Sequence, residues 1–161
     1  MRFKEFTNNL DSILVELARL IVDSRRELGN AGGDVGACVL TPTGNKVVGI
    51  SIQKKDGSWM HAERVAIDKY LKQYGDIPAD SILITTLSPC SEHMDDRHGS
   101  SCTDLIKHYN IKKVYCGYND PTQDHSDNYD HKHFNVQLTD NEKLQDLCKS
   151  FADTFLPVEA H

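Results

Sequence analysis

The sequence has no long apolar run, since none approaches the roughly 18 consecutive apolar residues that a membrane-spanning helix needs. The first residues, MRFKEFTNNLDS, also lack the apolar core of a secretory signal. These two absences argue against a membrane partner and against export. We therefore expect a cytoplasmic protein.

Positive charge is scarce as well. The chain has 18 Lys and Arg against 24 Asp and Glu, which gives a formal net charge of −6. Proteins that bind nucleic acid take much of their affinity from Lys and Arg at phosphates, so this balance argues against nucleic acid as a partner. The five cysteines are an odd number, and a reducing compartment disfavours disulfides. Metal binding or burial is therefore the preferred interpretation of these thiols.

Length and composition fit one globular domain. The chain has 161 residues, of which 39% are hydrophobic and 26% are charged. That is the balance of a protein able to bury a core. No internal repeat or linker divides the sequence. We expect a single domain that spans residues 1–161.

The spacing of apolar residues predicts helices and strands in alternation. The run SILITTL is continuous and β-branched, which suits a strand buried on both faces. The turn TPTGN favours an antiparallel hairpin, whereas the later strand–helix–strand units favour parallel pairing with helices on both faces of the sheet. The expected helices cover 8–28, 60–75, 102–109 and a segment that begins near 139–142; the expected strands cover 34–40, 46–52, 81–87, 112–118 and 134–138.

The segment TDNE, at 139–142, has the pattern of a capping box and introduces the C-terminal helix. One face of that helix is expected to carry Leu144, Leu147, Cys148, Phe151 and Phe155. Cys38, Cys116 and Cys148 fall on core positions of strands or helices, so they are interpreted as small buried hydrophobic residues.

Three residues with metal-binding side chains lie at the ends of expected elements. His61 begins the second helix, Cys90 follows the third strand, and Cys102 begins the third helix. One imidazole and two thiolates could converge on one ion, and zinc suits that set of ligands. Three ligands would leave a fourth position open to water, as in a catalytic site. Taken alone, PCSEHMDDRHGSSC could also be a redox pair or a polar loop with two incidental thiols.

Glu63, two residues after His61, favours a hydrolytic site over a structural one. Zinc lowers the pKa of bound water toward roughly 7, and a nearby carboxylate can take the proton of that water and pass it on. A structural site has no use for such a carboxylate.

Helix N-termini near the two cysteines would favour their thiolate forms. Coincidence on an ordinary α/β domain and a purely structural zinc site remain the two alternatives.

The sequence His61-Ala62-Glu63, followed by Pro89-Cys90 and by Cys102, resembles the signature of the cytidine-deaminase-like zinc superfamily. Three further segments resemble more narrowly the pyrimidine deaminase of riboflavin biosynthesis: DVGACVL, TTLSPCSEH and CTDLIKHYNIKKVYCGYNDP. The similarity covers about residues 30–125. Its motif residues are specific to the superfamily and less specific to the branch.

The resemblance implies a three-layer α/β/α sandwich with a mixed sheet of about five strands and the hairpin at one end. It implies that His61, Cys90 and Cys102 bind one zinc ion per chain and that Glu63 is the proton shuttle. The implied reaction is hydrolytic deamination, in which activated water attacks the ring carbon that bears an exocyclic amine. Glu63 then protonates the ring nitrogen and the amine, and ammonia leaves. A small nucleobase-type substrate and a homo-oligomer are also implied.

Three features depart from the riboflavin branch. Eleven residues separate Cys90 from Cys102, where the riboflavin branch has about eight and nucleoside and nucleic-acid deaminases usually have about two. Ser100-Ser101 stands in place of Pro-Pro before the second cysteine. Ala31-Gly32-Gly33 stands in place of Pro-Asn-Pro, whose Asn lines the substrate pocket in many relatives. The segment 91–101 leaves one expected ligand and returns to another, so we expect it to help determine the substrate.

Several residues near the expected ligands are candidates for contact with the substrate. They are Trp59, Ala62, Ser88, Pro89, His93, His98, Asn119 and Asp120. Trp59 could stack on a substrate ring or could simply anchor the start of the helix. The backbone around Pro89 and Cys90 could bind the leaving amine.

Other histidines and carboxylates could suggest a second metal site. His93 and His98 share their segment with Glu92, Asp95 and Asp96, but a solvated insertion is the favoured interpretation there. His125, His131 and His133 lie among Asp, Asn and Lys, which is typical of an exposed loop.

The expected function is release of ammonia from an aminated pyrimidine-type ring, in a nucleoside, a nucleotide or an intermediate like those of the riboflavin pathway. Deamination of a base in DNA or RNA is one alternative, and it would need a groove with phosphate contacts. A noncatalytic, zinc-stabilised binding module is an alternative of another class. The sequence does not choose the substrate.

Overall fold

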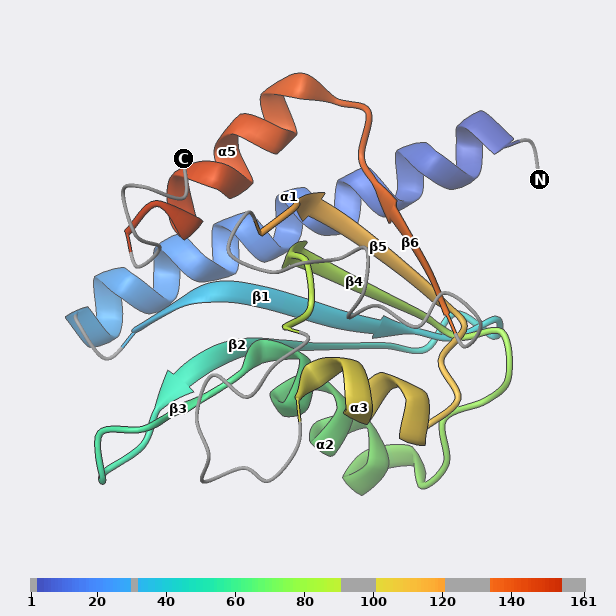
Figure 1. The fold of residues 1–161 in the computed structure, drawn as a ribbon, viewed down its shortest axis with the longest axis horizontal. Helices are drawn as coiled ribbons and strands as arrows, with labels where there is room; N and C mark the ends of the chain where they lie inside the picture. The colour runs from blue at the N-terminus through green and yellow to red at the C-terminus, as the bar shows by residue number, and fades with distance from the viewer. Residues whose placement is uncertain (1–2, 30–31, 91–100, 121–133, 155–161) are drawn as a thin grey trace.

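The computed structural model describes residues 3–29, 32–90, 101–120 and 134–154. Six strands form one mixed sheet in the order β3-β2-β1-β4-β5-β6. Helices α1 and α5 cover one face of the sheet, and α2 and α3 cover the other (Figure 1). The expected three-layer α/β/α sandwich is therefore confirmed, with six strands instead of about five. The elements are α1 (Phe3–Leu28), β1 (Gly32–Leu40), β2 (Lys46–Gln53), β3 (Trp59–Met60), α2 (Ala62–Tyr74), β4 (Ile82–Leu87), α3 (Cys102–His108), β5 (Lys113–Tyr118), β6 (Asn135–Leu138) and α5 (Glu142–Ala152).

The additional strand, β3, is two residues long. Its residues pair antiparallel with the end of β2, Met60 with Ile52 and Trp59 with Gln53. A tight turn connects the two strands, in which Lys54 N–H donates to the Ser58 carbonyl at 2.7 Å and Gly57 adopts a positive φ of 88°. Two residues are too few to produce an alternating pattern, so periodicity alone could not reveal this strand.

Strand directions follow the connections between the strands. The hairpin β1–β2 is antiparallel and β1 also pairs antiparallel with β4, whereas β4 pairs parallel with β5 and β5 with β6. The parallel pair β4–β5 is joined through α3, as the expected strand–helix–strand unit requires. Every residue of β4 is buried, in agreement with its continuous apolar sequence.

Both faces of the sheet pack against helices. Leu14, Leu17 and Ile21 of α1 have no exposed surface and belong to the cores on one face. On the other face α2 packs closely on β2, because Gly49 has no side chain: a Cβ there would lie 2.6 Å from the backbone nitrogen of Ala66. This close contact fixes the position of α2, which carries Glu63 in its first turn. No helix of the described residues is long and apolar enough to cross a membrane.

The start of α5 differs from the expected capping box. The cap is Asn141, whose side chain accepts a hydrogen bond from Leu144 N–H at 3.1 Å. Thr139 does not cap the helix: its hydroxyl donates to Asp11 of α1 at 2.7 Å and accepts from the N–H of Asn141, the cap residue itself, at 3.2 Å. Leu147 is 39% exposed, so its expected place on the buried face is wrong. Phe155 lies outside the described residues.

Asp11 of α1 joins β5 and the residue that follows β6, and its removal should destabilise the fold. Its Oδ1 accepts hydrogen bonds from Tyr115 Oη and Thr139 Oγ1, both at 2.7 Å, and both donors are almost fully buried. We expect Asp11→Ala to lower the free energy of unfolding by about 2–4 kcal/mol, because two buried hydroxyls lose a charged acceptor. Chemical denaturation measures this loss. Asp23→Ala, at an exposed position of the same helix, is the control and should change stability by less than about 0.5 kcal/mol.

Candidate active site

His61, Cys90 and Cys102 lie at the ends of different elements. His61 is the residue before α2, in an extended conformation, and its carbonyl accepts a hydrogen bond from Val65 N–H. Cys90 follows β4, and Cys102 is the first residue of α3. Residues distant in the sequence thus lie together because α2 and α3 pack side by side on the same face of the sheet (Figure 1).

The three candidate ligand atoms are close together. His61 Nδ1 lies 3.5 Å from Cys90 Sγ and 3.3 Å from Cys102 Sγ, and all three atoms lie within 4.8 Å of one another. A tetrahedral zinc ion with bonds of roughly 2.1 Å to nitrogen and 2.3 Å to sulfur places such atoms roughly 3.6 Å apart. The spacing and the donor types therefore fit zinc. Within the described part of the chain, no other group of three metal-binding side chains has this arrangement.

The two cysteines differ in their affinity for a proton. The Cys102 thiol donates to the Cys90 sulfur, and this bond, with others from His61 and the Cys102 N–H, lowers the pKa of Cys90 to about 5. The same bond and complete burial raise the pKa of Cys102 well above its usual value. The two shifts have opposite directions, so Cys102 holds its proton more tightly than Cys90 does. A bound metal takes both as thiolates, so binding would release the proton of Cys102.

Backbone contacts hold Cys90 against the start of α3. The Cys90 carbonyl accepts hydrogen bonds from Thr103 N–H at 3.1 Å and from the Thr103 hydroxyl at 2.8 Å. Ser101, where relatives were expected to have proline, caps α3 through its side chain, which accepts from Asp104 N–H at 3.1 Å. Cys90 and Ser101, the described residues on either side of 91–100, are therefore both held by hydrogen bonds to the start of α3.

Glu63 is buried beside the candidate ligands. Only 4% of its surface is exposed, and this desolvation raises its pKa. Its Oε2 lies 3.5 Å from Cys102 Sγ, and its Oε1 lies 3.3 Å from the hydroxyl of Thr85 in β4. A buried carboxylate with a perturbed pKa beside a metal-binding set is typical of a catalytic site.

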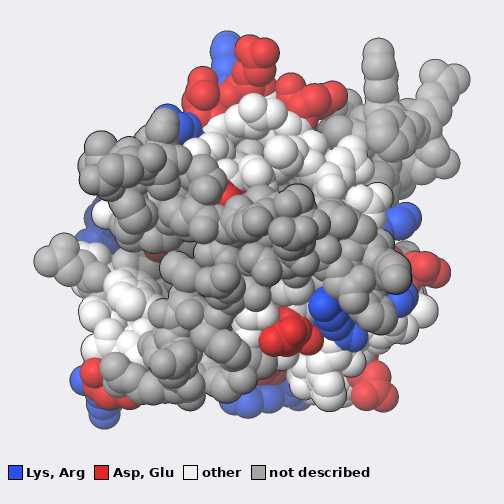
Figure 2. All heavy atoms as spheres, viewed as in Figure 1, with Lys and Arg blue, Asp and Glu red and all other residues white. Residues whose placement is uncertain are grey.

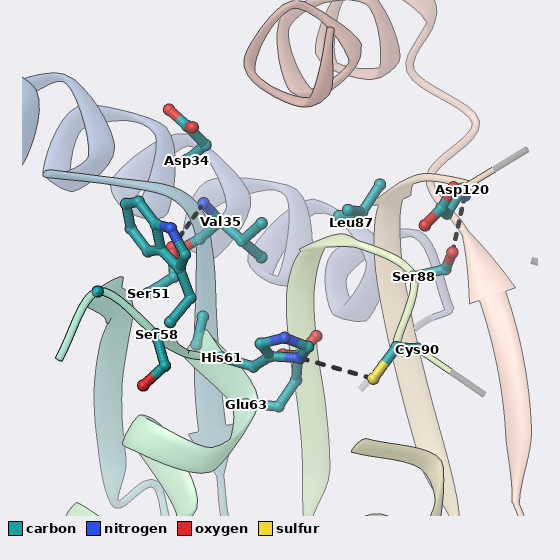
Figure 3. Close-up of a pocket in the computed structure, with 13 residues that line it drawn as sticks. Asp34, Val35, Ser51, Ser58, His61, Glu63, Leu87, Ser88, Cys90 and Asp120 are labelled. Carbon is teal, nitrogen blue, oxygen red and sulfur yellow. Dashed lines mark hydrogen bonds between the residues drawn. The ribbon is translucent and has the colours of Figure 1, made fainter. Parts of the chain in front are cut away.

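The hydroxyl of Ser88 fixes the chain that leaves β5. It accepts a hydrogen bond from Asp120 N–H at 2.8 Å, and the Ser88 N–H donates to the Tyr118 carbonyl at 2.9 Å. These bonds join the ends of β4 and β5 beside Cys90 (Figure 3). Asp120 is consequently buried at the side of the site.

A cavity of about 530 Å³ opens onto His61, Glu63 and Cys90 (Figure 3). Among the expected substrate contacts, Trp59, Ala62, Ser88 and Asp120 line it. Pro89 is buried and Asn119 is exposed, and neither is among the lining residues. His93 and His98 lie outside the described residues, as do Glu92, Asp95, Asp96, His125, His131 and His133.

The remaining wall comes from residues that the sequence analysis did not select: Asp34, Val35, Ser51, Gly57, Ser58 and Leu87. Gly33 allows β1 to approach β2 here, because a Cβ on Gly33 would lie 1.9 Å from the Ser51 carbonyl oxygen. A residue with a side chain would therefore clash at position 33, which explains why glycine stands there in place of the expected proline. The pairing of β1 with β2 is irregular between Gly32 and Gly36, and Asp34 and Val35 of this bulge line the cavity. In the sequence, the pair Gly32-Gly33 was the feature from which this bulge, and so this part of the cavity wall, could have been predicted.

Asp34 lies on the side of the cavity opposite Cys90, and its carboxylate points away from His61 (Figure 3). Arg25 of α1 donates to this carboxylate, through Nε at 2.7 Å and through a second guanidinium nitrogen. The same guanidinium lies 5.1 Å from the ring centre of Phe151. The charge of Asp34 is therefore balanced by a cation from outside the cavity wall.

Comparisons with known proteins agree with this geometry. Residues 9–118 match the family model described as the cytidine and deoxycytidylate deaminase zinc-binding region. Among curated proteins, none matches the chain. A solved diaminohydroxyphosphoribosylaminopyrimidine deaminase/5-amino-6-(5-phosphoribosylamino)uracil reductase from Thermotoga maritima is 25% identical, with a TM-score of 0.67 over 91% of this chain. The alignment covers 41% of that protein, so this chain spans less than half of its length.

Two other solved structures share the fold. The dCMP deaminase from the cyanophage S-TIM5, in complex with dCMP and dUMP, is 22% identical with a TM-score of 0.56; the match covers 86% of this chain and 98% of that one. A RibD from Acinetobacter baumannii is 19% identical with a TM-score of 0.62, over 92% of this chain and 39% of that one. The family match covers more than half of the chain and includes the candidate zinc ligands. This chain therefore belongs to the cytidine and deoxycytidylate deaminase zinc-binding family.

Proposed function

We propose that this protein is a zinc-dependent hydrolytic deaminase that releases ammonia from an aminated pyrimidine-type ring. One observation carries the proposal: a buried carboxylate, Glu63, lies beside an imidazole and two thiols at the wall of a cavity of about 530 Å³. A noncatalytic zinc module has no need of a buried acid at that place, because burying a charged carboxylate costs stability.

His61, Cys90 and Cys102 would hold one zinc ion per chain. Three protein ligands leave a tetrahedral ion with one open position. When bound in such a site, zinc supplies Lewis-acid chemistry that makes water a good nucleophile at neutral pH. The cavity lined by His61 and Cys90 gives a substrate access to that position.

Glu63 would move the protons of the reaction. Water adds its oxygen to the ring carbon, the carbon–nitrogen bond to the exocyclic amine breaks, and ammonia leaves. One proton of the water passes through the Glu63 carboxylate to the neighbouring ring nitrogen, and the other passes through it to the departing amine. Oε2, the carboxylate oxygen nearer to Cys102, is suited to this exchange because it faces the ligand set.

The described cavity wall favours an unphosphorylated substrate. Its ionisable side chains other than the two candidate ligands are Glu63, Asp120 and Asp34, whose charge Arg25 balances, and the described wall includes no Lys or Arg. The neighbour from Thermotoga maritima is named for a phosphoribosyl substrate and the cyanophage enzyme for dCMP. We expect this chain to differ from them in accepting a free base or nucleoside, and by resemblance we also expect a homo-oligomer.

A polynucleotide substrate is less well supported. On the described part of the face in Figure 2, Lys and Arg are scattered and do not form a stripe, while Asp and Glu gather over the region of α5. Binding of single strands usually depends on a positively charged groove. A small molecule is therefore the favoured substrate.

Cys102→Ser tests the ligand set. We expect the variant to fall from about one zinc per chain to almost none, because zinc prefers thiolate to a hydroxyl. Elemental analysis after dialysis measures the metal. Cys38→Ala, a buried cysteine on the opposite face of the sheet, should retain zinc. Full zinc in Cys102→Ser would show that the third ligand is another residue, with His93 and His98 the next candidates.

Glu63→Gln tests the proton shuttle. The amide keeps the size of the side chain but cannot carry a proton, so kcat for ammonia release should fall by about 100-fold to 10,000-fold while zinc stays bound. Glu16→Gln, which changes a partly exposed acid paired with Lys46, should leave kcat unchanged. An unchanged kcat in Glu63→Gln would remove Glu63 from the mechanism.

A panel of substrates tests the reaction and its specificity. It contains cytosine, cytidine, their mono- and triphosphates, the deoxy forms, diaminopyrimidine nucleotides, guanine and single-stranded DNA. We expect kcat/KM for the unphosphorylated compounds to exceed that for their phosphates by about tenfold or more, because the described wall offers no Lys or Arg to a phosphate group. If the zinc-loaded protein released no ammonia from any of them, the proposed function would fail. A preference for phosphates would overturn the substrate class alone.

A further inference from the structure

Thr85 lies behind Glu63, in the centre of the sheet. It belongs to β4, pairs with Ala37 of β1 and Cys116 of β5, and has no exposed surface. A hydroxyl in such a place must find hydrogen-bond partners within the protein. Its hydroxyl donates to the Leu87 carbonyl oxygen at 2.7 Å and, sharing the same proton, to Glu63 Oε1 at 3.3 Å.

The short bond to the backbone fixes the hydroxyl. Because Leu87 is the last residue of the same strand, Thr85 is anchored by β4 itself and does not depend on the substrate or on a loop. The fixed hydroxyl then contacts one particular carboxylate oxygen of Glu63, Oε1. The other oxygen, Oε2, lies on the side of Cys102. The two oxygens of Glu63 thus have different surroundings.

We propose that Thr85 is a positioning residue for the reaction, which orients the Glu63 carboxylate by holding Oε1 so that Oε2 faces the metal centre. The inference rests on the proposed deaminase function. A carboxylate without this contact could rotate about its terminal bond, and a misplacement of about 1 Å in a reacting group can cost about 100-fold in rate. Thr85 acts through Glu63, so its effect belongs to kcat more than to substrate binding.

The neighbouring residue provides a matched control. Thr86 is also a buried threonine of β4, 1% exposed, and its Oγ1 accepts a hydrogen bond from Gly36 N–H at 3.1 Å. This bond joins β4 to β1, and Thr86 is not among the residues that line the cavity. A substitution of Thr86 therefore reports what the loss of a buried strand hydroxyl does to the fold alone.

The experiment compares Thr85→Val, Thr85→Ser and Thr86→Val, with kcat, KM, zinc content and Tm measured for each. Thr85→Val keeps the shape but removes the hydroxyl, and we expect kcat to fall by about 10-fold to 100-fold with KM within about threefold and zinc retained. Thr85→Ser restores the hydroxyl and should return kcat to within about threefold of the wild type. Thr86→Val should lower Tm but keep kcat.

A double variant tests whether the effect passes through Glu63. In a Glu63→Gln background, Thr85→Val should cause no further loss of kcat, because the group that it positions is already disabled. A crystal structure of metal-free Thr85→Val gives a readout that does not depend on activity, and it should show the Glu63 side chain rotated. If valine does not fit at position 85 and the protein fails to fold, Thr85→Ala removes the hydroxyl with a smaller side chain.

Several results would overturn the inference while leaving the deaminase in place. They are a wild-type kcat in Thr85→Val or Thr85→Ala, a kcat in Thr85→Ser as low as in Thr85→Val, or an equal loss in Thr86→Val. An unmoved Glu63 in the variant structure would do the same. Absence of ammonia release by the wild-type protein across the substrate panel would instead overturn the proposed function and this inference together.

Discussion

The carbonyl oxygen of Cys90 accepts two hydrogen bonds from Thr103, and the geometry of the candidate centre depends on this contact. The bonds join the end of β4 to the first turn of α3 and so bring two cysteines that are twelve positions apart to within hydrogen-bond distance of the same imidazole. The parallel pairing of β4 with β5 requires α3 to cross over the sheet, and this crossover returns Cys102 to the place where Cys90 ends. The strand order and these two hydrogen bonds therefore bring the candidate ligands together without a metal.

The sequence predicted much of this arrangement. The continuous apolar strand before Cys90 and the helical pattern after His61 placed the candidate ligands at element ends, and the structure brings their ligand atoms together. Such patterns are informative because an element that buries a whole face has apolar residues at regular intervals in its sequence. The strand–helix–strand pattern favoured helices on both faces of the sheet, and the three-layer sandwich itself was implied by the resemblance to the deaminase superfamily.

The sequence could not predict features that depend on single contacts between distant residues. The two-residue strand β3 is too short to have a period, and it depends on the turn at Gly57. Thr139 has the local pattern of a helix cap, but its hydroxyl bonds to Asp11, which is 128 positions away. Asp34 lines the cavity only because Gly33 permits a close approach between two strands. In each case a tertiary contact outweighs the local preference.

The centre also shows a conflict between stability and chemistry. Glu63 is almost completely buried, and the hydrogen bond between the two cysteine sulfurs lowers the pKa of Cys90 and raises that of Cys102, so three ionisable groups lie together in a poorly hydrated place. Such groups destabilise a fold unless they are paired. A bound metal would replace the proton of Cys102 with a cation. The metal-free protein is therefore expected to be less stable than the metal-bound protein.

The contacts that close the centre have a further consequence for how this chain can change. Ser101 caps α3, Thr103 binds the Cys90 carbonyl, and Ser88 holds the start of the chain after β5; none of these bonds depends on how many residues separate Cys90 from Cys102. The length of that segment is therefore decoupled from the geometry of the ligands. A change in the number of residues between the two cysteines would therefore leave these described hydrogen bonds, and the positions of the candidate ligands, unchanged.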